Sequence, residues 1–208
     1  MASEAESNNR LGGLLEKLIL GIDPGSKITG YALIEVPAGI VASPRLLKVR
    51  DAGVFRVDPS LGFTEKLGLL HRALYHVVSI HQPSASIFEK PFYGKNVSTT
   101  IRLAETRGAL MAACARERIE IHEITPAEVK KIVTGSGQAD KNQVALGLKS
   151  LLQFDVKDLP YDAADAVAIA FSYCMRMTSI KDAQKDGFSR RTFANRLMPS
   201  VQNFKSGI

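Results

Sequence analysis

Apolar and polar positions recur along the chain with two periodicities, one typical of β-strands and one typical of α-helices. Apolar runs bounded by turn residues predict five strands, at residues 18–22, 28–36, 45–57, 85–89 and 119–124. Short polar turns join the first three strands. This arrangement predicts an antiparallel meander at the start of the domain.

Helical spacing governs most of the remaining chain. Leucines and valines recur at helical spacing between residues 67 and 78, and Gln82-Pro83 ends that pattern. Further helices are expected over 97–118, from Thr125-Pro126 onward, over 140–152, and after Pro160. Because strands alternate with helices after the meander, the order predicts an α/β domain, with a mixed five-stranded sheet covered by helices on both faces.

The predicted elements place one domain at residues 16–178 of the 208-residue chain. Residues 1–15 and 179–208 depart from the pattern, and we expect both to be flexible extensions. Between residues 181 and 208, six basic residues outnumber two acidic ones, which gives this tail a charge of 6 − 2 = +4. A basic arm for DNA is the alternative interpretation of the tail.

Two acidic residues stand where apolar strands end. Asp23 follows the strand 18–22 and precedes Pro24-Gly25, and Glu89 closes the strand that begins at residue 85. Burying an unpaired carboxylate costs several kcal/mol, so each acid should be either capped or a ligand. For Asp23 taken alone, a cap of the following turn is the commoner arrangement.

Two more acids, Asp162 and Asp165, lie three residues apart in a predicted helix of small side chains, which places them on one helix face. Acids in a first helical turn also favour the helix dipole, an explanation that suits Asp162 better than Asp165. Asp165 has no basic residue within one turn in either direction. It therefore needs a partner from elsewhere in the chain, or a cation.

Four carboxylates gathered in one place would repel one another strongly. Two unit charges 4 Å apart interact by about 4 kcal/mol at an effective dielectric constant of 20, so such a cluster takes up protons or binds divalent cations. Oxygen ligands favour Mg²⁺ or Mn²⁺ over Zn²⁺. Two such ions, roughly 3.5–4 Å apart, are typical of phosphodiester hydrolysis.

The charge of the chain fits a partner that is a polyanion. The sequence has 27 Lys and Arg against 21 Asp and Glu, a net charge of +6. Without the four candidate ligands the balance is 27 − 17 = +10. This excess predicts salt-sensitive binding to nucleic acid, without distinguishing DNA from RNA.

The cysteines and the N-terminus indicate a cellular compartment. Cys114 and Cys174 fall within apolar helical stretches and are expected to be core thiols in a reducing environment. The first 13 residues carry two glutamates and no apolar core, so they do not form a signal peptide. No apolar run approaches the roughly 18 residues that span a bilayer. We expect a cytoplasmic protein.

Four stretches of the chain resemble the RuvC family of bacterial Holliday-junction resolvases. They are LILGIDPGSKITGYALIE, IFEKPFYGKNVSTTIRLAETRGAL, TPAEVKKIVTGSGQADKNQV and YDAADAVAIAF. Their order and spacing match the family as well, and together they frame residues 18–176. The resemblance implies a ribonuclease H-like fold and a nuclease that depends on Mg²⁺, with two ions in each active site and Mn²⁺ able to substitute.

The resemblance also assigns roles to individual residues. The family's metal-binding carboxylates match Asp23, Glu89, Asp162 and Asp165. Two lysines near the scissile phosphate match Lys130 and Lys141, although a solvent-exposed helix charge is an equal alternative for Lys130. The loop residues assigned to DNA contact are Phe92, Lys95 and Asn96. Phe92 would lie at the junction centre and stack on a base, and its alternative role is ordinary core packing.

The family's partners and assembly complete the expectation. The resemblance implies a homodimer that nicks two strands of a four-way DNA junction symmetrically, with RuvA and RuvB as branch-migration partners. Its interface would lie on helix 97–118, along Ile101, Ala104, Gly108, Met111 and Ala115. Those small side chains could equally face the protein's own sheet. The alternative functions are a nuclease acting on RNA or on hybrids, and a catalytically silent junction-binding protein.

Overall fold

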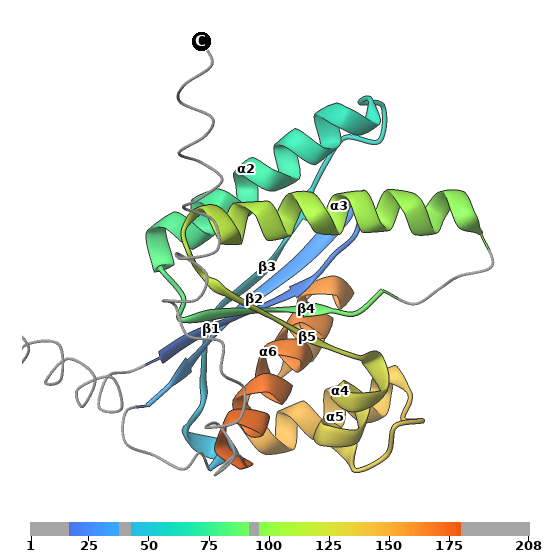
Figure 1. Ribbon diagram of the computed structural model, residues 1–208. Coiled ribbons are helices and arrows are strands. Elements are labelled where there is room, and N and C mark those ends of the chain that lie inside the picture. The colour runs from blue at the N-terminus through green and yellow to red at the C-terminus, as the bar shows by residue number, and fades with distance from the viewer. Residues whose placement is uncertain (1–16, 38–42, 92–95, 180–208) are drawn as a thin grey trace, which may run out of the picture. The chain divides into compact units, whose positions relative to one another are not determined.

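A five-stranded mixed sheet forms the centre of the computed structural model, which describes residues 17–37, 43–91 and 96–179 (Figure 1). The strand order is β3-β2-β1-β4-β5, with β1 at Lys17–Asp23, β2 at Ile28–Val36, β3 at Lys48–Arg56, β4 at Ala85–Glu89 and β5 at Glu120–Ile124. The first three strands pair antiparallel, as predicted. Strands β4 and β5 then add to β1 in parallel.

Helices cover both faces of this sheet, as the sequence predicted (Figure 1). One face carries α2 at Phe63–His81 and α3 at Val97–Arg116. The opposite face carries α4 at Pro126–Thr134, α5 at Lys141–Leu152 and α6 at Tyr161–Ser179. Two short 3₁₀ helices, η1 at Pro44–Leu46 and η2 at Val156–Asp158, complete the elements.

Successive residues of the central strands supply two separate cores, one on each face of the sheet. Ile19 of β1 and Ile87 of β4 pack with α4, α5 and α6, whereas Leu20 and Phe88 pack with α2 and α3. All four side chains are fully buried. This alternation is the two-residue period of a strand, and it explains why β1 and β4 carry apolar side chains on both of their faces.

Several element boundaries differ from the sequence prediction. The third strand begins at Lys48, because η1 occupies the residues that follow Pro44. The helix predicted over 97–118 ends at Arg116, and Arg118 adopts a positive φ of 58° that a helix cannot continue. Cys114 and Cys174 are buried free thiols, as predicted.

The predicted domain boundaries stay predictions. Residues 1–15, and all of the predicted tail after residue 179, lie outside the described part of the chain. Among the described helices, none combines the length and the apolar character that a membrane crossing requires.

Candidate active site

Asp23 and Glu89 end two neighbouring parallel strands. In the β1–β4 ladder Ile22 pairs with Phe88, and the next residue of each strand is the acid. Because parallel strands present their carboxyl ends at the same sheet edge, the two carboxylates lie at that edge together.

Helix α6 reaches this edge because two glycines let it approach the sheet closely. A Cβ atom on Gly30 of β2 would lie 1.9 Å from the main-chain oxygen of Asp162, and one on Gly21 of β1 would lie 2.3 Å from that of Ala166. Gly30 is also the β2 partner of Asp23. The first turn of α6, with Asp162, therefore packs directly beside Asp23, and Asp165 follows one turn later.

The turn after Asp23 is held by another residue. The buried Thr29 donates its hydroxyl to the main-chain oxygen of Gly25 at 2.8 Å and accepts from the Gly25 N–H at 3.3 Å. Thr29 thus takes the capping role that the sequence left open for Asp23. The Gly25 N–H, which a turn cap by Asp23 would bind, therefore donates to Thr29 instead.

Electrostatic coupling shows that the four acids share one site. The pKa of Asp23 is raised to about 7, first by burial and then by the negative charges of Glu89, Asp165 and Asp162. Burial and the charge of Asp165 also raise the pKa of Glu89. The structure therefore brings together the four carboxylates that the sequence selected.

Both predicted lysines lie at this cluster. Lys141, the first residue of α5, places its Nζ 3.1 Å from Oδ2 of Asp165, and this hydrogen bond raises the pKa of the lysine. The partner that the sequence required for Asp165 therefore comes from another helix. Lys130 of α4 acts on the site by charge, since it lowers the pKa of Glu89.

The donor set suits a divalent cation. All four side chains offer carboxylate oxygens, and the mutual repulsion that raises the pKa of Asp23 and Glu89 is relieved by positive charge. Within the described residues, no three Asp, Glu, His or Cys side chains are already arranged to hold a metal ion. The site therefore has the chemistry of a metal centre, without side chains already closed around an ion.

The predicted DNA-contacting residues fall at the start of α3. Phe92 and Lys95 lie outside the described residues. Asn96 is the N-cap of α3, where its side-chain oxygen accepts from the Thr99 N–H at 3.1 Å. A role for Asn96 in DNA binding stays a prediction.

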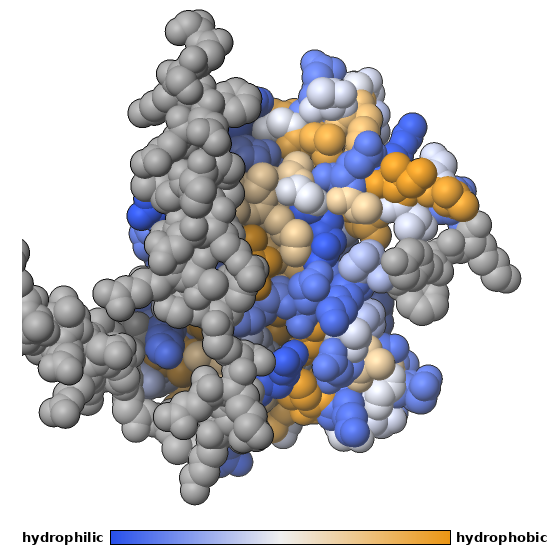
Figure 2. Space-filling model, in the orientation of Figure 1, coloured by the Kyte–Doolittle hydropathy of each residue, from blue (hydrophilic) through white to orange (hydrophobic). Residues whose placement is uncertain are grey.

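The N-terminal part of the stripe on α3 does not face the protein's own sheet, whereas Met111 packs partly buried against the core of that face. Ala104 and Gly108 are exposed, and no heavy atom lies within 4 Å of a Cβ built on Gly108. The buried face of α3 carries Thr106, Leu110, Ala113 and Cys114 instead. Apolar surface lies over the N-terminal end of this helix, where Val97 is 70% and Ile101 53% exposed (Figure 2).

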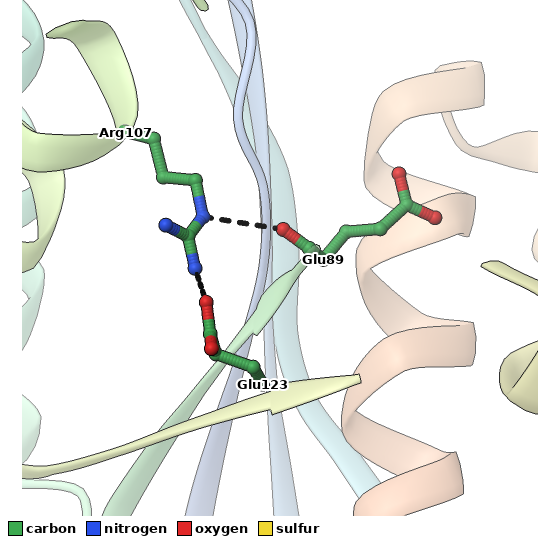
Figure 3. A network of polar contacts seen from close by, with 3 residues as sticks. All are labelled: Glu89, Arg107 and Glu123. Carbon is green, nitrogen blue, oxygen red and sulfur yellow. Dashed lines mark hydrogen bonds and ion pairs between the residues drawn. The ribbon is translucent and has the colours of Figure 1, made fainter. Parts of the chain in front are cut away.

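Two residues near the site were missed by the sequence analysis. Arg107 of α3 donates from Nε to the main-chain oxygen of Glu89 at 3.3 Å and forms an ion pair with Glu123 of β5 (Figure 3). Helical spacing could have identified Arg107 as a residue on the buried side of α3. Arg107 lies four residues after Leu103 and three before Leu110, on the inward side of the helix.

Comparisons with known proteins agree with this arrangement. The family model described as crossover junction endodeoxyribonuclease RuvC matches residues 19–173. A RuvC protein of Caldicellulosiruptor saccharolyticus is 36% identical over 162 residues, which cover 78% of this chain and 95% of that protein. One from Mycobacterium marinum is 35% identical over 167 residues, covering 80% and 88% respectively.

Solved structures show the same fold. The Thermus thermophilus RuvC complex with a Holliday junction substrate has a TM-score of 0.70 and 24% identity, and covers 78% of this chain and 97% of that chain. The yeast mitochondrial Holliday junction resolvase has a TM-score of 0.56 and 16% identity, with coverages of 77% and 78%. The expected ribonuclease H-like fold is confirmed. The chain belongs to the RuvC family of crossover junction endodeoxyribonucleases.

Proposed function

We propose that this protein is a structure-specific endonuclease that resolves four-way DNA junctions by paired, symmetric nicks. The observation that carries the proposal is the convergence of four carboxylates, from β1, β4 and α6, at one edge of the sheet in a member of this family. The curated relatives named crossover junction endodeoxyribonucleases support the same activity, which serves DNA recombination and repair.

Membership of this nuclease family implies dependence on a divalent metal. We propose Mg²⁺, two ions in each site, with Mn²⁺ as a substitute. The ligands would be Asp23, Glu89, Asp162 and Asp165. Bound metal supplies an activated water and charge stabilisation for the leaving oxygen of a phosphodiester.

The lysines supply positive charge to the same site. The Lys141–Asp165 ion pair is exposed, with 70% of the lysine side chain and 40% of the aspartate side chain accessible. An exposed pair contributes only about 0–1 kcal/mol, so Lys141 loses little when its ammonium turns from Asp165 to a phosphate oxygen. Lys130 would contribute charge from the side of Glu89. Both lysines would hold the scissile phosphate against the carboxylates.

The wider DNA contact is proposed on the sequence. Phe92 would stack on a base at the junction centre, with Lys95 and Asn96 beside it. RuvA and RuvB would be branch-migration partners, and the cytoplasm would be the compartment. The net charge of +6 predicts that junction affinity falls steeply with salt.

The test is cleavage of a synthetic mobile four-way junction by the purified protein. With Mg²⁺ we expect nicks at symmetric positions on two strands of like polarity, leaving 5′-phosphate and 3′-hydroxyl ends that ligase can seal. Replacing Mg²⁺ with Ca²⁺ should preserve binding and stop cleavage. Equal cutting of linear duplex, or faster cutting of an RNA–DNA hybrid, would favour the general nuclease instead.

Paired nicking requires two active sites, and we propose a homodimer formed through the stripe on α3, whose residues Ile101, Ala104 and Gly108 are exposed. A tryptophan at Gly108 enters open space in the monomer, but it would obstruct a close helix contact between two copies. We expect Gly108→Trp to run as a monomer in light scattering while the wild type runs as a dimer.

Gly68→Trp on α2 is the matched control, because a Cβ on Gly68 also meets no atom closer than 3.8 Å. This variant should stay dimeric. A wild type that is monomeric both free and bound to a junction would exclude the paired mechanism in this form.

A further inference from the structure

Arg107 is a cation largely buried beneath α3, with 15% of its side chain exposed. It makes three directed contacts. Nε donates to the main-chain oxygen of Glu89 at 3.3 Å, and Nη2 pairs with the carboxylate of Glu123. The guanidinium carbon lies 5.9 Å from the centre of the Phe88 ring. A planar fork that serves two acceptors at fixed angles is particular to arginine.

The contact between Arg107 and Glu89 lies just beyond the last residue of β4 that pairs with β1. The β1–β4 pairing ends at Ile22 and Phe88, whereas the β4–β5 pairing continues to Glu89 and Ile124. The Lys90 N–H then donates to the main-chain oxygen of Ile124 at 2.8 Å. At Glu89 the main chain is therefore held by β5 and by Arg107, without a β1 partner.

The main-chain oxygen and the side chain of Glu89 point in opposite directions. Figure 3 shows its main-chain oxygen directed at Arg107 and its side chain extending the other way, toward the orange helix α6. The charges that act on this carboxylate are those of Asp165, Lys141 and Lys130. The charge of Arg107 is matched by Glu123 instead. Arg107 therefore fixes the backbone of Glu89 and leaves the carboxylate free for the cluster.

We propose that Arg107 is a positioning residue, which holds the end of β4 against α3 so that the Glu89 carboxylate enters the metal-binding cluster at the correct place. The inference rests on the proposed metal-dependent function. According to this inference, metal affinity depends on the hydrogen bond from Arg107 to the main-chain oxygen of Glu89, one of the proposed ligands. Loss of groups that orient metal ligands typically weakens metal affinity or activity by about 10- to 100-fold.

The test compares Arg107→Gln and Arg107→Lys with a matched control, Arg50→Gln. Arg50 of β3 also pairs with a glutamate, Glu35, at 3.0 Å. Glu35 pairs with Leu18 at the start of β1, the end of the sheet opposite Asp23. Two quantities are measured for each variant. They are the rise in melting temperature on adding Mg²⁺ or Mn²⁺, and the metal concentration that gives half-maximal single-turnover junction cleavage.

For Arg107→Gln we expect the half-maximal metal concentration to rise by about 10- to 100-fold, with a smaller metal-induced rise in melting temperature and unchanged junction binding. Arg107→Lys should fall between Arg107→Gln and the wild type, because the ammonium carries its donors on one nitrogen, whereas the guanidinium serves Glu89 and Glu123 from two, Nε and Nη2. Arg50→Gln should match the wild type in both measurements.

Three results would overturn the proposal. Wild-type metal dependence in Arg107→Gln, even with a lower melting temperature, would make Arg107 a purely structural residue. Full wild-type behaviour in Arg107→Lys would show that charge alone matters. If the wild type gains no stability from metal, the proposed metal site does not exist and Arg107 has no ligand to position. If the wild type binds metal but cuts no junction, the proposed function fails, and the melting temperatures still decide the role of Arg107.

Discussion

Asp23→Asn should abolish junction cleavage while junction binding persists. Asparagine keeps the shape of the side chain and removes the charge that would hold a metal ion, so we expect the single-turnover rate to fall by more than about a thousand-fold, or about 4 kcal/mol of transition-state stabilisation. The same loss is expected for Glu89→Gln, Asp162→Asn and Asp165→Asn. Binding is measured separately, by gel shift in Ca²⁺.

Asp155→Asn is the matched control for these variants. Asp155 pairs with Lys149 near the C-terminal end of α5, and it is absent from the charges that act on Asp23 and Glu89. Its loss should leave cleavage at the wild-type rate. If any one of the four active-site variants cuts like the wild type, that residue leaves the proposed ligand set. Joint loss of binding and cleavage would instead mean that the acids shape the DNA surface.

Local pattern was sufficient for most of the elements, because each carries its own signal. The short apolar runs of β1 and β4, the capping box of Thr125 and Glu128 with Pro126 at the first helical position, and the Asp140 cap of α5 all act within a few residues. Boundaries were less predictable where two signals compete. At the start of β3, strand-forming residues follow Pro44, and the 3₁₀ turn prevails.

The convergence of the site could not be deduced from local pattern. Asp23 and Glu89 meet because β4 adds to β1, and α6 reaches them because Gly21 and Gly30 leave room for its backbone. These are contacts between distant segments. The resemblance to a family selected the four acids, whereas the sequence alone left a turn cap open for Asp23. The partner of Asp165 was predicted only as something from elsewhere, and Lys141 lies 24 residues away.

Two features of α3 were not settled from the sequence: what its small residues contact, and on which side of the helix Arg107 lies. Small residues such as Gly108 and Ala104 suit a buried helix contact with the sheet or with a second copy equally well, so the sequence left both open. Arg107 was passed over because arginines are mostly exposed, although its spacing from Leu103 and Leu110 places it on the inward side. The ion pair with Glu123, whose own side chain is 41% exposed, is what makes that position tolerable.

The cluster should also make the metal-free protein less stable as pH rises. The pKa of Asp23 is about 7 in the folded chain against 3.8 as its ordinary value, so between these pH values the folded state keeps a proton that the unfolded state has lost. Stability therefore falls as pH rises through this range and levels off above pH 7. The raised pKa of Glu89 acts in the same direction.

Asp23→Asn isolates this contribution, because the amide does not titrate. In chelator, the free energy of unfolding of the wild type should drop between pH 5.5 and 8 relative to the variant, and by pH 8 the variant should be the more stable by at most about 4 kcal/mol. Denaturant unfolding at several pH values measures the difference. The catalytically dead variant is thus expected to be the more stable protein.

Asp155→Asn again serves as the control. Its partner Lys149 lowers the pKa of Asp155 from its ordinary value of 3.8, so the stability that this group contributes is gained at lower pH and adds no slope between pH 5.5 and 8. Parallel pH profiles for the wild type and Asp23→Asn would contradict the prediction, because they would mean that Asp23 is ionised in the folded protein throughout this range. The repulsion that a divalent cation is proposed to relieve would then be absent.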